Sequence, residues 1–484
     1  MQPVEVNLNA IPASLARRAL LLALTPLSAL SAMSALSASA RAADPAARDA
    51  VLPLSVFYSL FDDDRRRALA ALGRIGAEWQ DGYAALLIEL LGFLTERQTQ
   101  AGVVALLDRA AGRPLGDDLD RRYAWLWSIN PRPHPDYAEF KAALYEQIDP
   151  RFREYFANDR QTLIRLDEIR WGGVRRDGIP PLKNPPMVGA DQAGWLADGH
   201  VVFGIEIDGD ARAYPKRILA WHEMFKDRVG GREVTGVYCT LCGAMVLYDS
   251  VVAGTHHELG TSGFLYRSNK LMYDQATKSM WSTLGGNPVV GPLVGQGIEL
   301  LPLQVVTTTW GAWRARHPQS RVLSLATGHQ RDYAEGVAYR DYFANDKLMF
   351  GVPRLDARLP NKAEVLALRS AQPPAGALAE TLAETLAIAA DYLRAHPVHH
   401  DRLGPQELVV LTDASGANRV YAAGGVRLAS WDGVDSATDR EGGRWRVDEG
   451  GLHGPAGQQL ARLPAHRAFW FGWYAAYPQT RLVK

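Results

Sequence analysis

The only two cysteines of the chain, Cys239 and Cys242, lie in a Tyr-Cys-Thr-Leu-Cys-Gly motif at residues 238–243. This spacing brings two sulfur atoms to one turn, and the glycine that ends the motif lets backbone amides approach them. Such a pair can supply two thiolate ligands to a metal, or it can act as a dithiol that cycles with a reducible disulfide. It can also be an inert pair of buried thiols or a local structural disulfide. The spacing favours a metal or redox site over an inert pair.

A metal bound by this pair would be copper or zinc, because both accept thiolate ligands well. Other segments of the chain must then complete the coordination shell. His222 is the leading third ligand, and Met272, whose soft thioether favours copper, and Glu223 are further candidates. The competing interpretation of His222 is a hydrogen-bonded histidine of the core.

The sequence excludes several other kinds of site. Gly243 stands where a c-type haem motif has its histidine. A thioredoxin-like dithiol opens a long amphipathic helix, whereas the run Met245–Tyr248 after this motif predicts a strand. No phosphate-binding loop, dinucleotide fingerprint or His-Glu-x-x-His motif occurs in the sequence, so no nucleotide cofactor is predicted.

Length and charge set the broad class. A chain of 484 residues is too long for one ordinary core, which predicts several domains. The 53 basic and 53 acidic residues cancel, so no overall field attracts nucleic acid or an anionic membrane. No basic stretch with interleaved aromatic residues stands out, and we therefore expect no nucleic-acid partner.

Residues 1–42 have the pattern of a signal peptide. Arg17 and Arg18 precede the apolar run 19–36, and the small-x-small sequence 40–42 is a cleavage signal. We expect cleavage near Ala42 and export, with a periplasm as the destination. The arginine pair is compatible with the twin-arginine route, but an ordinary Sec signal also carries basic residues there. Nothing after the apolar run resembles a stop-transfer segment, so no membrane span is predicted after cleavage.

Residues 43–168 are predicted to form a helical accessory domain. Leucine and alanine recur there at three- and four-residue spacing with charges between them, as on amphipathic helices. A Pro-rich turn at 131–135 precedes a further helix, which is expected from Asp136 to Ile148. The Gly- and Pro-rich stretch 171–186 then marks a boundary.

Mainly strands are predicted after this boundary. Residues 201–207 form an apolar β-type run, and Asp208-Gly209 directly after it is a hairpin signal. A short helix is expected near Lys216 to Phe225. These elements must place the cysteine turn, because the turn lies between two apolar runs of the same region.

An internal repeat divides this region into two units. Residues 309–323 align without gaps on residues 469–483, and upstream matches keep their order and similar spacing. The sequence therefore predicts an α+β protein in which the helical domain precedes two related β-rich units, 184–326 and 350–484, packed as a pseudo-symmetric pair. The second unit carries an Ala-rich stretch, Ala377 to Ala395, which we expect to be helical.

The repeat separates residues that serve the fold from residues that are free to serve a site. Both thiols are missing from the second unit, where Ser415 stands at the position of Cys242. Glu223 is replaced by Pro397. His222, in contrast, keeps a counterpart in His396, which favours a structural role for it. The cysteines are thus a feature of one specialised copy.

These motifs resemble the DUF3179 family, a domain of unknown function found in bacteria and archaea. The resemblance rests on residues 177–180, 213–215, 221–223, 238–243, 260–266, 269–274, 277–281 and 469–473. Similar proteins usually have proline in place of Thr240, and threonine is expected to loosen the turn. The family implies no activity. The helical region before residue 171 lies outside the resemblance.

Two functions follow as hypotheses. The first is an exported protein that binds copper or zinc, or performs dithiol–disulfide redox chemistry, at Cys239 and Cys242. The second is a non-catalytic binding or assembly protein in which the cysteines only hold a loop and the helical domain contacts a protein partner. The residues define no substrate and no reaction.

Overall fold

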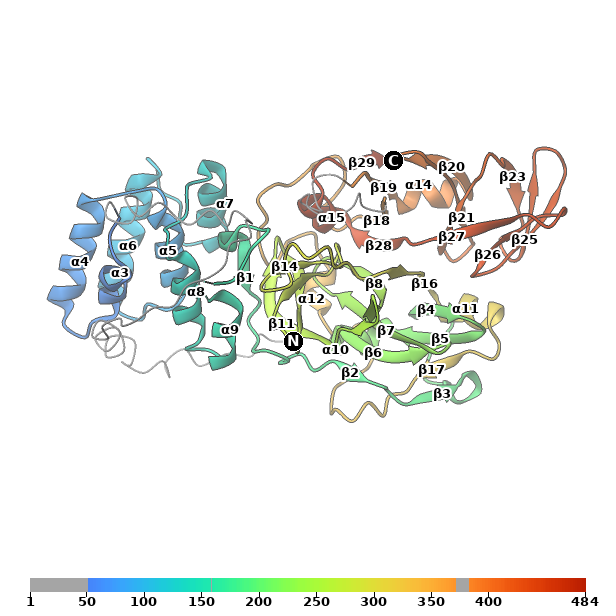
Figure 1. Cartoon of the computed structure of the whole chain (residues 1–484), viewed down its shortest axis with the longest axis horizontal. Coiled ribbons are helices and arrows are strands. Elements are labelled where there is room, and N and C mark those ends of the chain that lie inside the picture. The colour runs from blue at the N-terminus through green and yellow to red at the C-terminus, as the bar shows by residue number, and fades with distance from the viewer. Residues whose placement is uncertain (1–50, 158, 371–382) are drawn as a thin grey trace, which may run out of the picture. The chain divides into compact units, whose positions relative to one another are not determined.

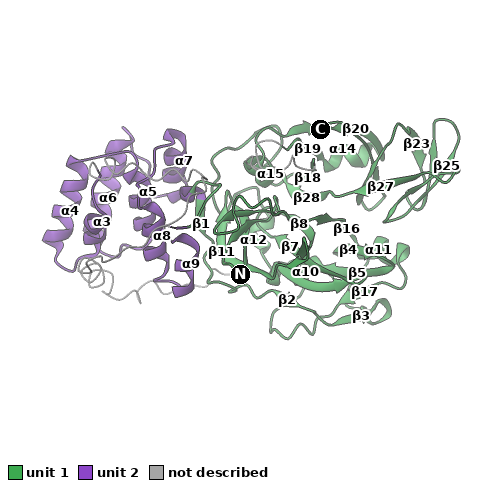
Figure 2. Ribbon diagram, in the orientation of Figure 1, with its two compact units in different colours: residues 1, 160–165, 169–484 green, residues 2–159, 166–168 purple. Residues whose placement is uncertain are grey.

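The computed structural model describes residues 51–157, 159–370 and 383–484 (Figure 1). The predicted signal peptide lies outside the described residues. The described residues form two compact units, of which one contains residues 160–165, 169–370 and 383–484 and the other contains residues 51–157, 159 and 166–168 (Figure 2). Helices and sheets both contribute, so the prediction of a mixed α+β protein is confirmed. None of the described helices is long and apolar enough to cross a membrane.

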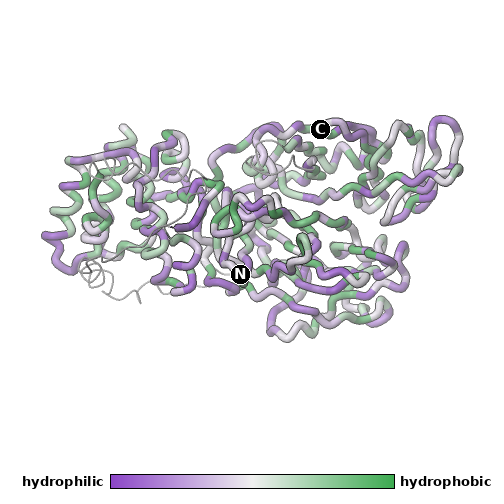
Figure 3. The backbone as a smooth tube through the Cα atoms, in the orientation of Figure 1, coloured by the Kyte–Doolittle hydropathy of each residue, from purple (hydrophilic) through white to green (hydrophobic). Residues whose placement is uncertain are grey.

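The smaller unit is built from helices. Acidic side chains begin three of them, because Asp64, Glu96 and Asp118 each accept hydrogen bonds from backbone amides of the first turn. The central helix α5 is buried along its whole length, and apolar segments, green in Figure 3, run through the unit. The α-helices are α3 (Leu54–Tyr58), α4 (Arg65–Ala77), α5 (Tyr83–Leu91), α6 (Arg97–Ala110), α7 (Leu119–Ile129), α8 (Tyr137–Tyr145) and α9 (Arg153–Phe156).

The first half of the larger unit contains three five-stranded sheets. Their orders are β16-β4-β5-β17-β3, β15-β8-β7-β6-β2 and β1-β11-β12-β13-β14. The strands are β1 (Ile169–Trp171), β2 (Leu182–Lys183), β3 (Met187–Gly189), β4 (Val201–Ile207), β5 (Asp210–Pro215), β6 (Met224–Val229), β7 (Arg232–Cys239), β8 (Ala244–Asp249), β11 (Leu259–Tyr266), β12 (Asn269–Asp274), β13 (Met280–Ser282), β14 (Pro288–Val290), β15 (Pro302–Leu303), β16 (Val306–Thr309) and β17 (Arg321–Leu323). Helices α10 (Lys216–His222) and α11 (Trp310–Arg316) join them, and β9 (Val251–Val252) pairs with β10 (Thr255–His256).

The second half contains a four-stranded sheet, β28-β18-β19-β29, and an eight-stranded sheet, β20-β21-β22-β27-β26-β25-β24-β23. A connection with the short helix α12 (Arg340–Phe343) leads into it. The elements are β18 (Glu364–Arg369), β19 (Thr385–Ala389), α14 (Ala390–Ala395), β20 (Val398–Leu403), β21 (Gln406–Thr412), β22 (Asn418–Ala422), β23 (Leu428–Trp431), β24 (Ser436–Asp439), β25 (Arg444–Val447), β26 (Gly451–His453), β27 (Gln459–Leu463), β28 (His466–Phe469), α15 (Trp470–Ala476) and β29 (Arg481–Val483).

Two local predictions are confirmed. The hairpin between β4 and β5 turns at Asp208 and Gly209, both of which have positive φ, as a two-residue turn of this kind requires. The helix expected near Lys216 to Phe225 is α10, which ends at His222 because Glu223 takes a left-handed conformation with φ 56°.

The Ala-rich stretch from Ala377 to Ala395 is only partly helical, which corrects the prediction. Its first residues lie outside the described part of the chain, 385–389 form strand β19, and only α14 is a helix. Strand β19 is completely buried between β18 and β29. Burial in a sheet therefore overrides the helix propensity of alanine at these positions.

Candidate functional site

The cysteine turn, residues 239–244, joins β7 to β8. Cys239 ends β7 and pairs in register with Ala244, the first residue of β8. Gly243 closes the turn with φ 62°, a left-handed conformation that is energetically unfavourable for residues with a Cβ. A Cβ at this position would lie 2.9 Å from the ring of Phe469. The glycine is therefore required both by the backbone and by the packing.

Both cysteines are free thiols with almost no exposed surface. The Cys242 sulfur lies 3.9 Å from the carbonyl oxygen of Cys239. Burial would raise the pKa of Cys239, but hydrogen bonds from the Cys242 thiol and from the backbone of Cys242 and Lys270 stabilise its thiolate and hold the pKa below its ordinary value. Burial and the neighbouring Cys239 raise the pKa of Cys242 instead. The pair is thus asymmetric, with Cys239 the more acidic thiol.

A buried ion pair lies beside the turn. Glu223 follows α10, and its carbonyl oxygen accepts a hydrogen bond of 2.8 Å from the amide of Tyr238. Its carboxylate forms a close ion pair with Lys270 of β12, and neither side chain is more than 9% exposed. The second carboxylate oxygen accepts hydrogen bonds from the hydroxyls of Thr240, at 2.7 Å, and Tyr339, at 3.0 Å. The charge of Glu223 is therefore fully compensated although it is buried.

Thr240 is not a loosening element in this turn. Its hydroxyl is the group that ties the turn to Glu223. A proline at this position would have no hydroxyl to make this bond, so threonine offers a side-chain hydrogen bond in place of a stiffer backbone.

The second half of the unit covers the turn. The amide of Phe469 donates a hydrogen bond of 2.7 Å to the carbonyl oxygen of Cys242. Gly472 lies so close that a Cβ there would be 2.6 Å from Cys242 Cβ. Tyr342 of α12 donates to the carbonyl oxygen of Leu241 at 2.7 Å. The two sulfurs are thus enclosed by segments far away in the sequence.

The predicted metal ligands Met272 and Glu223 differ in how they relate to the cysteine turn. Met272 is completely buried and belongs to the same core cluster as both cysteines. Glu223 contacts the turn through Thr240. Within residues 51–157, 159–370 and 383–484, no three His, Cys, Asp or Glu side chains form a group that could hold a metal ion. Of the predicted metal ligands other than the cysteines, Glu223 therefore contacts the turn directly, whereas Met272 shares only the core cluster with it.

His222 has both of its ring nitrogens occupied. Nδ1 lies 2.9 Å from the carbonyl oxygen of Pro180, and this nitrogen must donate because a carbonyl only accepts. Nε2 then accepts the hydroxyl of Tyr333, at 2.5 Å. A metal at Nε2 would have to displace Tyr333.

His222 makes stability depend on pH. Burial, with His329 and Arg331 nearby, outweighs the hydrogen bond to Pro180 and lowers the pKa of His222 from 6.5 to about 4. Between these values the unfolded chain binds a proton that the folded chain does not, so stability falls as pH is lowered, by up to about 3 kcal/mol. We expect a His222→Gln variant to be less stable than the wild type at neutral pH and the gap to narrow towards pH 4. Chemical unfolding at several pH values measures this, and a gap that does not change with pH would contradict it.

Several residues of the site were not predicted from the sequence. Lys270, Tyr339 and Tyr342 all contact the cysteine turn or its ion pair. Lys270 stands in a strand whose six residues are all buried. A lysine directly before the apolar residues 271–273 was the available signal, because buried lysines almost always have a charged partner.

A small cavity of about 120 Å³ lies beside the turn. Tyr238, Gly243 and Phe469 form one part of its lining, and the charged residues Lys216 and Arg467 form another. The Lys216 ammonium group lies 4.6 Å from the ring centre of Phe343. Gly243 therefore faces a cavity whose wall includes charged side chains, although the surrounding core is apolar.

Fold and site together define an α+β protein with a buried, asymmetric dithiol turn. A family model described as "Protein of unknown function (DUF3179)" matches residues 176–480. Because the match covers more than half of the chain, the protein belongs to the DUF3179 family, as its motifs predicted. No curated protein and no solved structure matches the chain.

Proposed function

We propose that this protein is an exported thiol–disulfide redox protein in which Cys239 and Cys242 carry the electrons. The observation that supports this most is that the two cysteines of the chain are free, buried thiols at one tight turn. Cys242 donates a hydrogen bond to Cys239 and lowers its pKa. A thiolate is the attacking species in disulfide exchange, so the more acidic thiol is suited to begin the reaction.

The exchange proceeds in two steps. Because both sulfurs are buried, the segments that cover the turn must open before the Cys239 thiolate can attack a disulfide of the partner. A bond then forms between Cys239 and one partner sulfur, the partner's disulfide breaks, and its second sulfur leaves as a thiolate. That thiolate takes the proton of Cys242. Cys242 then attacks the sulfur of Cys239, and the first partner sulfur leaves as a thiolate that takes from solvent the proton that Cys239 released when it ionised. The pair ends as a disulfide and the partner as a dithiol, with two electrons transferred.

Single-cysteine variants test this proposal. We expect Cys242→Ser to accumulate a mixed disulfide with oxidised glutathione through Cys239, because no second thiol can resolve it. Cys239→Ser should react far more slowly, since burial, the largest cause of the raised pKa of Cys242, remains in this variant. Mass spectrometry of the intact protein measures both adducts. The double Cys→Ser variant is the control, and a Cys242→Ser variant that stays unmodified while folded would refute the redox function.

Copper binding at the same pair is a second candidate. Met272 shares the buried core cluster with both cysteines, and two thiolates with a thioether are the soft donors that copper(I) prefers. Zinc also accepts thiolate ligands, and Glu223, which accepts a hydrogen bond from Thr240 of the turn, would be its further ligand. Metal analysis of protein isolated from the periplasm tests this. Stoichiometric metal that is lost in Cys239→Ser and reduced in Met272→Leu would support the metal site.

We further infer that the two halves of the larger unit are duplicated copies packed as a pseudo-symmetric pair. The strand order β16-β4-β5-β17 has the same form as β28-β18-β19-β29. In both sheets the second strand is antiparallel to its neighbours and the fourth is parallel to the third. The order β6-β7-β8-β15 likewise corresponds to β20-β21-β22-β27.

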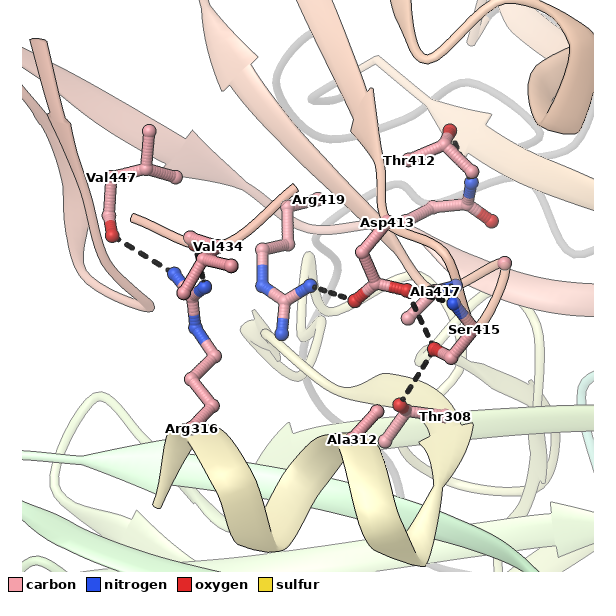
Figure 4. Close-up of polar contacts among 12 residues, drawn as sticks. Thr308, Ala312, Arg316, Thr412, Asp413, Ser415, Ala417, Arg419, Val434 and Val447 are labelled. Carbon is pink, nitrogen blue, oxygen red and sulfur yellow. Dashed lines mark hydrogen bonds and ion pairs between the residues drawn. The ribbon is translucent and has the colours of Figure 1, made fainter. Parts of the chain in front are cut away.

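Reciprocal contacts support this symmetry. The turn of the second copy, residues 412–417, contains Ser415 at the position of Cys242 (Figure 4). Ser415 lies 3.1 Å from the hydroxyl of Thr308 in the first copy. The cysteine turn contacts Phe469 of the second copy, which aligns with Thr309. Each turn therefore packs against the same strand of the other copy, as a two-fold interface requires.

The second turn holds itself together without sulfur. Asp413 accepts hydrogen bonds from the amides of Ser415 and Ala417 and forms an ion pair of 3.0 Å with Arg419 (Figure 4). A turn of this shape is therefore stable when polar side chains replace both cysteines. This supports a specific use for the thiols of the first copy, as opposed to the alternative in which they only hold the loop.

Export and the role of the helices complete the proposal. Cleavage near Ala42 would leave a mature chain that starts shortly before the first described helix. Amino-terminal sequencing of protein from the periplasm tests the cleavage site. The helical region 43–168 is proposed to contact a protein partner, which a pull-down with and without this region would identify.

A further inference from the structure

A long connection joins the two halves of the larger unit. It runs from residue 324 to residue 363, between β17 and β18, and α12 is the helix that it contains. Connections longer than roughly 12–15 residues with little secondary structure of their own are uncommon in compact folds and are often functional, for example as lids over a site. Residues 325–345, which we call the strap, contact α10 and the cysteine turn.

Two tyrosines hold the strap to α10 and to the residue that follows it. The hydroxyl of Tyr333 donates to Nε2 of His222, at 2.5 Å. The hydroxyl of Tyr339 donates to the carboxylate of Glu223, at 3.0 Å. In the opposite direction, the indole nitrogen of Trp221 donates to a carbonyl oxygen of the strap, at 2.8 Å. Glu223 also accepts a hydrogen bond from the cysteine turn, so the strap reaches the edge of the thiol site.

A third tyrosine of the strap lies against the thiols themselves. The hydroxyl of Tyr342 donates to the carbonyl oxygen of Leu241, which stands between the two cysteines, at 2.7 Å. Tyr342 also belongs to the same core cluster as both cysteines. Burial raises the pKa of Tyr342, and the neighbouring Cys239 and Cys242 raise it further, so the hydroxyl lies within electrostatic reach of both sulfurs. The strap is therefore part of the cover over the thiols.

The strap is held in place through side chains. In the part of the chain that the structure describes, residues 325–345 form no backbone–backbone hydrogen bond to a residue outside the strap. Most of its residues are exposed, and those that are buried are Tyr333, Ala338 and Tyr342. Segments with few buried residues and few backbone hydrogen bonds to their surroundings open at a lower free energy than the core does.

Both ends of the strap are anchored. The amide of Ser324 donates to the carbonyl oxygen of Pro186, at 2.9 Å. At the other end, the carboxylate of Asp346 accepts hydrogen bonds from the amides of Asn361, at 3.0 Å, and Lys362, at 2.8 Å. A segment that is fixed at its ends and held only by side chains between them can move away without unfolding the rest of the protein.

The other part of the cover is held more firmly. Phe469 lies in β28, where it pairs with Glu364 of the neighbouring strand, and its amide donates to the carbonyl oxygen of Cys242. Helix α15 follows directly and buries both Trp470 and Trp473. Displacing this cover would disrupt a sheet and the core cluster, so opening costs less at the strap.

We propose that the strap moves away from the cysteine turn between its two anchors, and that this opening is the route by which a partner reaches Cys239 and Cys242. The hydrogen bonds of the three tyrosines break, while β7, β8 and the sheet of the second half stay intact. The inference rests on the proposed redox function for its purpose, because buried thiols cannot exchange with a partner. The movement itself does not depend on the chemistry of the cysteines.

Alkylation of the reduced full chain by iodoacetamide, followed by mass spectrometry of the intact protein, tests the proposal. We expect the wild-type thiols to react at a rate that changes little with low concentrations of urea, because opening of the strap exposes far less surface than global unfolding. Tyr342→Phe and Tyr333→Phe should each raise this rate roughly two- to tenfold, as expected for the loss of one hydrogen bond. Since the Tyr333 hydroxyl binds His222 and not the turn, its effect reports movement of the strap as a whole.

Tyr248→Phe is the matched control. It removes a buried hydrogen bond of the same kind, from the Tyr248 hydroxyl to the carbonyl oxygen of Thr283 at 2.6 Å, and Tyr248 belongs to the same core cluster as the cysteines. Because Tyr248 lies in β8 and not in the strap, this variant should alkylate at the wild-type rate in the absence of urea.

Two results would overturn the proposal. One is alkylation of the wild type that rises steeply with urea, in parallel with global unfolding followed by tryptophan fluorescence; this measurement needs no variant. The other is a rate in Tyr342→Phe and Tyr333→Phe that does not exceed the rate in Tyr248→Phe, when circular dichroism shows all three variants to be folded. Iodoacetamide requires only an accessible thiol, so either result would leave the separate test of the redox function with oxidised glutathione unaffected.

Discussion

Replacement of Lys270 by methionine is expected to lower the free energy of unfolding by roughly 3–5 kcal/mol, the usual cost of leaving a buried charge without its partner. Glu223 would keep its hydrogen bonds from Thr240 and Tyr339 but lose its only cation among the described residues. Denaturant unfolding followed by tryptophan fluorescence measures the loss. Lys183→Met is the matched control, because Lys183 is largely exposed in its ion pair with Glu258 and should change stability by less than about 1 kcal/mol.

The double variant Glu223→Gln/Lys270→Met separates charge from packing. Since it removes both charges at once, it should recover much of the stability that Lys270→Met loses. The reactivity of Cys239 provides a second measurement of the loss of the Glu223 charge. Glu223 raises the pKa of Cys239, so the double variant should react with alkylating agents at lower pH than the wild type. A double variant that is less stable than Lys270→Met would show that the pair acts through packing alone.

Gly243→Ala is expected to destabilise the protein by roughly 2–5 kcal/mol, which sums the cost of a left-handed residue and of an overpacked core. The new methyl group would meet the ring of Phe469 at 2.9 Å. The ring must then move away from the cysteine turn. We therefore also expect faster alkylation of Cys239 and Cys242 in the folded variant.

The second copy supplies a matched control for this substitution. Gly416 stands at the position of Gly243 and also has positive φ, 83°, but a Cβ there would meet only the side chain of Arg394, at 3.5 Å. Gly416→Ala should therefore cost only the backbone term, roughly 1–2 kcal/mol. Equal losses in the two variants, measured by denaturant unfolding, would contradict the packing of Phe469 on the turn.

The helix, hairpin and strand around the site were correctly predicted from the sequence. The hairpin at Asp208-Gly209 needs two residues with positive φ, and the helix near Lys216 is bounded by a proline and by a left-handed residue. Strand β8 was predicted from the apolar run after the cysteines, and the structure confirms it. Each of these signals depends on neighbouring residues only, which is why sequence alone could give them.

The contacts that complete the site could not be obtained in this way. Lys270 and Tyr339 reach Glu223 from segments 47 and 116 residues away. Strand β19 was mistaken for part of a helix because its alanines are good helix formers, and only pairing with β18 and β29 makes it a strand. Such outcomes depend on which distant segments meet, and no local pattern encodes that.

The cover over the cysteine turn has a consequence for the time course of folding. Asn269, next to the turn, donates a hydrogen bond to Gly472, which is 203 residues away in the sequence. Contacts between such distant segments form slowly, because a long loop must close first. Until they form, both thiols are open to any oxidant in solution. We expect protein refolded in oxidising buffer to form the Cys239–Cys242 disulfide before these contacts close over the turn, so the oxidation state after refolding should depend on the redox potential of the buffer.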